Sequence, residues 1–340
     1  MVPDPLRLAD FDYALPSDRI AQTPAEPRDS ARLLVLNRAS GTFDDRTVSD
    51  LPDLLRPGDC LVVNDTRVLP ARLFGRRLSG GRVELLLLRR RDDGAWEALA
   101  RPARRLGVGT TITLDGGSSA CIIEEGVEGL RVVRLEDEAA ALAAGHTPLP
   151  PYITTPLTDP ERYQTIFARE PGSAAAPTAG LHFTPRLLDR LRARGIGVET
   201  ITLHVGLDTF RPVSEDDPRA HRLHSEWYRV STETAVALNQ VREAGGRIVA
   251  VGTTSVRTLE SAAEDDGSIR PRAGETRLYI LPGYRFRAVD ALFTNFHLPR
   301  STLLLLVSAF AGRERVLDAY HHAIAAGYRF YSFGDAMLIV

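Results

Sequence analysis

The chain has 340 residues, of which 44% are hydrophobic and 25% charged, and its formal net charge is −2. These values exclude a disordered or collagen-like chain, and the length favours about two domains. The nearly neutral balance argues against a general nucleic-acid-binding protein, which would be basic overall. Every basic residue is arginine, so no lysine is present to form a Schiff base or to act as a general base.

Residues 1–20 lack a basic region followed by an apolar run, as a secretory leader would have. The longest apolar run, residues 303–311, is shorter than the ~18 residues that a membrane span needs. Cys60 and Cys121 do not form a metal-type pair and are typical of a reducing compartment. We therefore expect a cytoplasmic protein with no membrane segment.

Residues 72–149 contain short β-forming runs, such as "RLFGRRL", "TTITL" and "LRVVRLE", separated by glycines and charged turns. This spacing predicts an antiparallel barrel or sandwich. We expect a β domain, barrel or sandwich, over residues 72–149, inserted into an α/β domain made of residues 1–71 and 150–340. Arginines gather in residues 75–82, 89–93 and 101–105; they form either solvated faces or phosphate contacts.

The C-terminal half alternates between segments with the periodicity of a strand and segments with the periodicity of a helix. Predicted strands are residues 198–206, 247–252, 288–296 and 328–340, and predicted helices are 185–194, 232–246, 255–264, 301–312 and 313–327. Thr184 and Ser301 are expected to cap their helices. This alternation predicts a parallel-type sheet covered on both faces, an αβα sandwich. The chain has no G-x-G-x-x-G, Walker A or G-x-S-x-G motif, which argues against common dehydrogenases, P-loop NTPases and α/β hydrolases.

Two segments each carry a single histidine that is a candidate for the functional site. The stretch "SAAAPTAGLHFT", residues 173–184, is built of small residues and carries one titratable ring, His182. In "LHVGLDTF", residues 203–210, His204 ends a predicted strand, where α/β sheets build their sites. A satisfied core histidine is the alternative for His204.

The segment "HRLHSEWY", residues 221–228, offers two alternatives. His221 and His224 could bind a metal only with a third ligand, which the sequence does not place beside them. Glu226 beside His224 is the more plausible acid/base pair. Trp227 and Tyr228 are candidates for stacking on a base or for facing a cation.

A strand–turn–helix pattern, "VGTTSVRTLE", covers residues 251–260. Free backbone N–H groups at the start of the helix favour an anion, and Arg257 could clamp a carboxylate or phosphate. The alternative is a capped structural helix in which Arg257 pairs with Glu260. We predict a substrate-binding turn formed by Gly252, Thr253, Thr254, Ser255 and Arg257.

Two further segments place polar groups near strand ends. "TNFHLPRSTL", residues 294–303, contributes Asn295 and His297 just before a capped helix. "RFYSFGDAM", residues 329–337, contributes Asp335 after Gly334. The alternative for Asp335 is a turn aspartate that binds its own backbone.

Together these motifs resemble the S-adenosylmethionine:tRNA ribosyltransferase-isomerase family of queuosine biosynthesis. The resemblance extends from Asp10 to Met337. The segments that carry it are "DFDYALP", "DTRVLPARLFG", "PLPPYI", "RYQTIFA", "AAPTAGLHFT", "LHVGLDTF", "HRLHSEWY", "VGTTSVRTLE", "TNFHLPRSTLLLLVSAFAG" and "YRFYSFGDAM". One position departs from the family, because Asp208 stands where these proteins usually have glycine, and it adds a negative charge near the expected site.

The resemblance implies a specific reaction. The ribosyl part of S-adenosylmethionine moves to the aminomethyl group of 7-aminomethyl-7-deazaguanine at the wobble position of tRNA, and adenine and methionine leave. It also implies an α/β domain with an inserted β-barrel, S-adenosylmethionine as cosubstrate, no prosthetic group and no metal; we expect a monomer. A methyltransferase and a non-catalytic RNA-binding protein are the alternatives.

That reaction needs a base, an acid, a clamp for the methionine carboxylate and a slot for an extruded base. The candidates for base and acid, not distinguished by the sequence, are His182, His204, Glu226, His297 and Asp335. We expect Pro177, Thr178 and Gly180 to line the nucleoside slot, with His182 pointing at the reacting centre, or else His182 to be structural. Thr254, Ser255 and Arg257 are expected to bind the carboxylate, and Asn295 is a further substrate-binding candidate.

Overall fold

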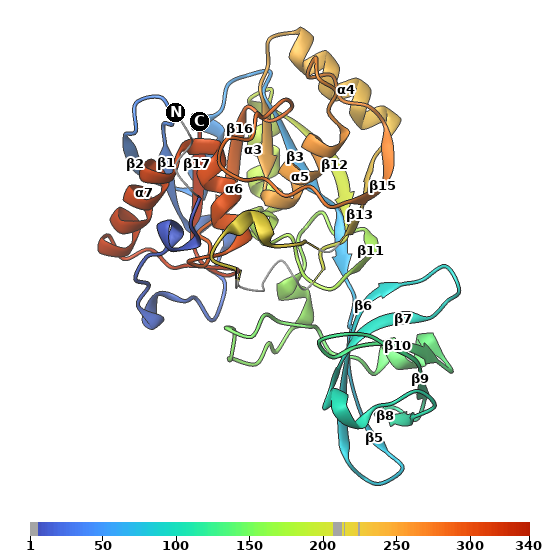
Figure 1. Cartoon of the computed structure of the whole chain (residues 1–340). Coiled ribbons are helices and arrows are strands. Elements are labelled where there is room, and N and C mark those ends of the chain that lie inside the picture. The colour runs from blue at the N-terminus through green and yellow to red at the C-terminus, as the bar shows by residue number, and fades with distance from the viewer. Residues whose placement is uncertain (1–5, 207–212, 214, 224) are drawn as a thin grey trace.

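The computed structural model describes residues 6–206, 213, 215–223 and 225–340, to which all structural statements refer. The chain forms an α/β domain and a smaller β-barrel that projects from one end of it (Figure 1). Short 3-10 helices join the main elements: Leu8–Phe11, Ser17–Arg19, Arg28–Ser30, Val48–Asp50, Ala103–Arg105, Pro160–Tyr163, Thr178–His182 and Pro218–Ala220.

A nine-stranded sheet forms the centre of the α/β domain. Its strands, in spatial order, are β15 (Arg272–Thr276), β13 (Glu226–Val230), β12 (Gly197–Leu203), β3 (Cys60–Asn64), β14 (Ile248–Val251), β16 (Ala291–Asn295), β17 (Ala336–Ile339), β1 (Arg32–Leu36) and β2 (Phe43–Thr47). The four strands from β12 to β16 are parallel, whereas β17 runs antiparallel to β16. The edge strands β15 and β2 also pair antiparallel with their neighbours.

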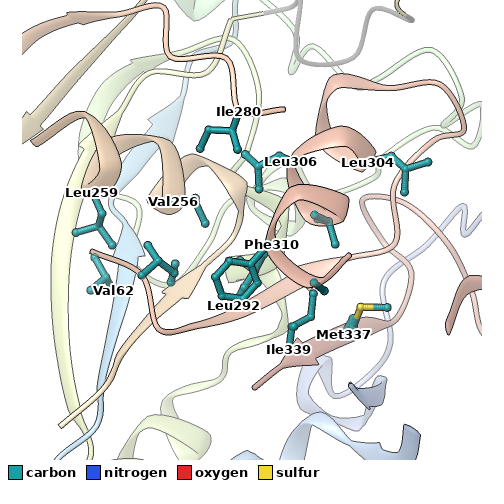
Figure 2. Close-up of a cluster of buried hydrophobic side chains, with 14 of the residues drawn as sticks. Val62, Val256, Leu259, Ile280, Leu292, Leu304, Leu306, Phe310, Met337 and Ile339 are labelled. Carbon is teal, nitrogen blue, oxygen red and sulfur yellow. The ribbon is translucent and has the colours of Figure 1, made fainter. Parts of the chain in front are cut away.

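Helices cover both faces of this sheet, because successive strand residues point to opposite sides. Cys60 and Val62 of β3 join a core with α4 (Thr232–Glu243), α5 (Thr253–Ala262), α6 (Thr302–Ala311) and α7 (Arg313–Ala325). Leu61 and Val63 of the same strand join a core with α1 (Leu51–Leu54) and α3 (Pro185–Ala193). The first core gathers Val256, Leu292 and Phe310 between the sheet and its helices (Figure 2). The predicted αβα architecture is confirmed.

The barrel is closed by six antiparallel strands in the order β10-β7-β6-β5-β8-β9. They are β5 (Arg72–Arg77), β6 (Arg82–Arg90), β7 (Trp96–Arg101), β8 (Thr111–Leu114), β9 (Ser119–Glu125) and β10 (Leu130–Leu135), followed by α2 (Glu138–Ala143). Alternate residues such as Leu73, Leu85 and Val133 fill its interior. The predicted antiparallel barrel is confirmed, while the domain boundaries beside residues 72 and 149 stay a prediction.

In the C-terminal half, most of the predicted ends of helices and strands agree with the structure. Thr184 and Ser301 each accept a backbone N–H with the side-chain oxygen, and they cap α3 and α6 as predicted. The final strand is shorter than predicted, because residues 328–335 form a turn before β17. A two-stranded parallel sheet of β4 (Thr66–Val68) and β11 (Glu170–Ser173) was not anticipated.

Candidate functional site

Two adjoining hollows contain most of the predicted site residues. The inner cavity lies where β14 and β16 end, and residues 176–179, the turn 252–254 and residues 294–298 line it. About 610 Å³ of space lies within it, open solvent at its mouth included. The carboxyl ends of parallel strands are where open α/β sheets bind ligands.

The outer groove separates the barrel from the α/β domain. Leucines and arginines of β6, β7 and β10 line one side, and Gly172, His204, Glu226 and Arg257 line the other. It spans about 5230 Å³ of space, open solvent included, and is much larger than the inner cavity. Leu303 lines both hollows, so they are neighbours at the first turn of α6.

The inner cavity receives six of the predicted substrate-binding residues. They are Pro177, Thr178, Gly252, Thr253, Thr254 and Asn295. No aspartate, glutamate or arginine occurs among the described residues that line it. Gly180 does not line it, because it packs against Thr165, which would lie 3.0 Å from a Cβ at position 180.

His297 is the titratable imidazole among the described residues of the inner-cavity wall. Its Nε2 lies 3.4 Å from Thr294 Oγ1, and its Nδ1 lies 3.4 Å from Tyr320 Oη. Burial lowers the pKa of His297 to about 3, so the ring is neutral at physiological pH. A base with so low a pKa binds a proton too weakly to be effective near neutral pH.

His297 should make stability depend on pH. The unfolded imidazole titrates near 6.5 and the folded one near 3, so between these values the unfolded state binds more protons. The free energy of unfolding should fall on acidification by up to about 1.4 kcal/mol per pH unit from this group. Urea unfolding between about pH 7 and pH 5 should show a shallower slope for His297→Gln. His321→Gln, at an exposed site on α7, is the matched control; equal slope changes in both variants would contradict this assignment.

The N-terminus of α5 divides the predicted anion-binding residues between the two hollows. Gly252 precedes the helix with φ +85°. Thr254 faces the inner cavity, and its buried Oγ1 has no hydrogen-bond partner. Ser255 is fully buried and its hydroxyl donates to Val251 O at 2.8 Å, so any contribution to ligand binding would come from its backbone N–H. Arg257, one turn later, lines the outer groove.

Arg257 is paired with Glu226, not with Glu260 as the structural alternative predicted. Arg257 Nη1 contacts Glu226 Oε2, and Nε donates to Leu278 O at 3.0 Å. The other carboxylate oxygen, Glu226 Oε1, accepts the Gly206 N–H at 2.8 Å. Arg257 Nη2 is buried without a hydrogen-bond partner.

Glu260 instead organises the loop before β16. Its carboxylate accepts the backbone N–H groups of Arg287, Ala288 and Val289 at 3.0–3.2 Å. Tyr284 also donates its hydroxyl to Glu260 at 3.2 Å. Glu260 is therefore a structural carboxylate with its acceptors engaged by the protein.

His204 lies at the end of β12 and lines the outer groove. Its ring stacks on Trp227 with 5.1 Å between centroids, and Nδ1 lies 2.8 Å from Thr66 Oγ1. Burial lowers the pKa of His204, which keeps the ring neutral at pH 7. Gly172 packs against the other nitrogen, since a Cβ at position 172 would lie 2.6 Å from His204 Nε2.

His182 and Asp335 lie behind the cavity wall and line neither hollow. His182 is 4% exposed, and its nitrogens lie 3.1 Å from Ala179 O and 3.0 Å from Gly334 O. Burial also lowers the pKa of His182. The ring joins the small-residue strip to the loop before β17, as the structural alternative expects, and a part for His182 at the reacting centre stays a prediction.

Asp335 supports the same loop. Its carboxylate accepts the backbone N–H groups of Arg32 at 3.0 Å and Arg329 at 2.7 Å. This is close to the turn-aspartate alternative, and its burial at 2% exposure separates it from both hollows. His182 and Asp335 thus both hold the loop before β17 through hydrogen bonds, and neither lines a hollow.

The remaining predicted groups divide between the groove, the core and the undescribed positions. Trp227 lines the outer groove, whereas Tyr228 is buried in the core at 4% exposure. His221 also lines the groove, with Nδ1 2.8 Å from Glu215 Oε2. Asp208 and His224 lie outside the described residues, so the predicted Glu226–His224 pair is not described.

Among the arginine clusters, the arginines of residues 89–91 are paired with carboxylates of the protein. Arg89 contacts Glu97 at 2.6 Å and Glu275 of β15 at 2.5 Å. Within the described ranges there is no group of three or more side chains suited to hold a metal ion. None of the helices in these ranges has the length and the apolar character to cross a membrane.

Sequence reasoning missed the aromatic part of the inner cavity. Tyr152, Tyr331 and Ser332 line it, as does the helix cap Ser301. Tyr152 and Tyr331 come from distant segments, and their ring centroids lie 4.8 Å apart. Both occur in segments that carry the family resemblance, "PLPPYI" and "YRFYSFGDAM", and that was the signal by which they could have been found.

Comparison with known proteins covers nearly the whole chain. A family model described as queuosine biosynthesis protein matches residues 8–339. A Symbiobacterium thermophilum protein named S-adenosylmethionine:tRNA ribosyltransferase-isomerase is 56% identical over 98% of this chain and 100% of its own length. A Gloeobacter violaceus protein of the same name is 56% identical over 97% and 95%. The crystal structure of the S-adenosylmethionine tRNA ribosyltransferase from Thermotoga maritima, 40% identical, covers 97% of this chain and 100% of its own with a TM-score of 0.58.

Proposed function

The chain belongs to the queuosine biosynthesis protein family, and on that basis we propose that it is a tRNA ribosyltransferase-isomerase. It transfers and isomerises the ribosyl moiety of S-adenosylmethionine onto the aminomethyl group of 7-aminomethyl-7-deazaguanine at the tRNA wobble position. The products are epoxyqueuosine in tRNA, adenine and methionine. The observation that supports this best is the junction of a small cavity with a much larger groove at the ends of the central strands.

The two substrates divide between the hollows in this proposal. The nucleoside part of S-adenosylmethionine occupies the inner cavity, whose described lining is uncharged. The methionine carboxylate reaches toward Arg257, which has an unpartnered Nη2. The anticodon loop lies in the outer groove. A base in this single-stranded loop costs less free energy to extrude than a base in a duplex.

His204 is the proposed general base. Its neutral ring faces the groove and can take a proton from the carbon beside the sulfonium. Glu226 fixes Arg257 by the buried ion pair. His297, also neutral, supplies a hydrogen bond inside the cavity. His182 and Asp335 are positioning residues, because they hold the wall through backbone carbonyl and N–H groups.

The other parts of the proposal concern surroundings and partners. The enzyme uses no prosthetic group and no metal, acts as a monomer, and works in the cytoplasm, where its free cysteines Cys60 and Cys121 would stay reduced. A methyltransferase would use the same cosubstrate but release S-adenosylhomocysteine. A non-catalytic RNA-binding protein would consume nothing.

Product analysis tests the function directly. The pure protein is incubated with S-adenosylmethionine and tRNA that carries 7-aminomethyl-7-deazaguanine, with no added metal. We expect adenine and methionine in equal amounts and a matching mass gain on the wobble nucleoside. Release of S-adenosylhomocysteine, or binding of tRNA without consumption of cosubstrate, would overturn the proposal.

A further inference from the structure

The inner cavity contains an aromatic wall, formed by Tyr152 and Tyr331, to which sequence reasoning gave no role. We propose that this wall binds the adenine ring of the cosubstrate and holds it as the leaving base. The proposal rests on the proposed function, since it names the part of S-adenosylmethionine that the cavity recognises. Three observations carry it: the geometry of the wall, the backbone of Tyr331, and the chemistry of the other lining groups.

The two rings form one fixed surface. Their centroids are 4.8 Å apart with an interplanar angle of 53°. The hydroxyl of Tyr152 lies 2.7 Å from Ser332 Oγ, which ties the first ring to the residue after the second. Tyr331 is 5% exposed and Tyr152 is half-buried, so most of the rotational freedom of both rings is lost before a ligand arrives. Prearranged aromatic surfaces bind planar bases at low entropic cost.

The backbone of Tyr331 is held in a left-handed conformation, with φ +72°. Residues other than glycine rarely adopt this conformation, and where they do it often serves a function. Three hydrogen bonds maintain it: Asn295 Nδ2 donates to Tyr331 O at 3.1 Å, Gly334 N donates to the same oxygen at 3.0 Å, and Tyr331 N donates to Phe296 O at 3.2 Å. Asn295 in turn accepts the Thr178 hydroxyl at 3.1 Å. The end of β16 and the small-residue strip therefore fix the ring at the cavity.

The other lining groups favour an uncharged, planar ligand with polar edges. The described lining offers hydroxyls, one amide and a neutral imidazole, but no side chain that could neutralise a carboxylate or an ammonium group. Burying such charges without partners would be costly. Thr254 Oγ1 is buried at the cavity with no partner of its own, and it can bond a ring nitrogen or an exocyclic amine. An adenine ring meets these conditions, whereas the amino-acid end of the cosubstrate fits the pair of Arg257 and Glu226.

The sulfonium group of S-adenosylmethionine is the alternative ligand for the two tyrosine rings. A sulfonium cation is attracted to the face of an aromatic ring, so the wall could face the sulfur instead of the base. The two assignments differ for ligands that lack the positive charge. Adenine and S-adenosylhomocysteine both contain the base without a sulfonium, and they are the probes of the test.

The experiment measures calorimetric binding of adenine, S-adenosylhomocysteine and S-adenosylmethionine to the whole protein. Tyr331→Leu removes the ring, and Tyr331→Phe keeps it. We expect Tyr331→Leu to weaken all three ligands by about tenfold or more, and Tyr331→Phe to stay within about twofold of the wild type. Tyr152→Leu should show the same pattern and serves if Tyr331→Leu does not fold. Tyr284→Leu, a half-buried tyrosine that lines neither hollow, is the matched control.

Two results would overturn the proposal. Unchanged adenine affinity in the folded leucine variants removes the wall from base recognition. Weaker binding of S-adenosylmethionine alone assigns the wall to the sulfonium. Failure of the proposed function has a different signature, since wild-type protein would then release no adenine and methionine in the product analysis.

Discussion

Gly172→Ala is expected to lower kcat by about 10²- to 10⁴-fold, the range by which a positioned general base accelerates a reaction. Gly172 belongs to β11 and lies in the wall of the outer groove. A Cβ on it would lie 2.6 Å from Nε2 and 2.7 Å from Cε1 of His204, distances at which something must move. The imidazole cannot keep its stack on Trp227 and its contact with Thr66 while that methyl group is present. Steady-state turnover of S-adenosylmethionine with modified tRNA measures the loss.

Gly274→Ala separates contact from backbone strain. Gly172 has φ +151° and Gly274 has φ +156°, but a Cβ at Gly274 meets no atom within 4 Å. The backbone cost of alanine should therefore be similar at both sites, and only the Gly172 variant should lose kcat. His204→Ala should reproduce the loss. If His204→Ala turns over at a near-normal rate, His204 is not the base; if both glycine variants fall equally, the effect is conformational.

Arg257→Ala is expected to raise the KM for S-adenosylmethionine by about 10- to 100-fold, the value of a charge-assisted hydrogen bond. The KM for tRNA should change far less, because the proposed partner of Arg257 is the methionine carboxylate. The variant should also lose about 3–5 kcal/mol of stability, because Glu226 remains buried at 8% exposure without its cation. Steady-state kinetics with each substrate varied in turn, together with urea unfolding, measure the two effects.

Two further variants separate binding from stability. Arg257→Gln combined with Glu226→Gln removes both charges, so it should recover much of the stability while the KM for S-adenosylmethionine stays high. Arg247→Ala breaks a comparable pair, in which Nη2 of Arg247 lies 2.6 Å from an oxygen of buried Asp59. This pair lies at the N-terminal ends of β3 and β14, away from the proposed site. Arg247→Ala should cost stability without changing either KM. Equal rises in the KM of both substrates for Arg257→Ala would exclude the carboxylate assignment.

The sequence supports the prediction of elements better than the prediction of their pairing. The barrel strands and the helices α3 to α7 carry clear periodicity, turn residues and caps, which are local signals. The strand β15 was missed because it is short, charged and at the edge of the sheet, so no apolar pattern marks it. The strand β13 alternates buried Tyr228 and Val230 with partly buried neighbours, and that pattern was overlooked. The reversal of β17 relative to β16 depends on the path of residues 328–335, which no local pattern encodes.

The side chains of the site show the same difference, because local features could be predicted and contacts between distant segments could not. The turn at Gly252 could be predicted, because a helix start after a buried strand exposes N–H groups at a known place. The direction of His182 could not, because its ring is held by Gly334 O, a group 152 residues away in sequence. Thr254 and Arg257 are three residues apart and so lie on the same face of α5, and the turn between them places Thr254 in the inner cavity and Arg257 in the outer groove. The wall of Tyr152 and Tyr331 unites two segments by tertiary packing alone.

The two outermost strands of the large sheet have a consequence for the behaviour of the protein at high concentration. Both β2, "FDDRT", and β15, "RAGET", are five residues long, and each carries charged side chains on a largely exposed surface. Short, charged strands discourage the addition of a further strand from another chain, and a closed barrel has no free edge at all. The backbone groups at the two ends of the sheet are therefore poor templates for cross-β aggregation.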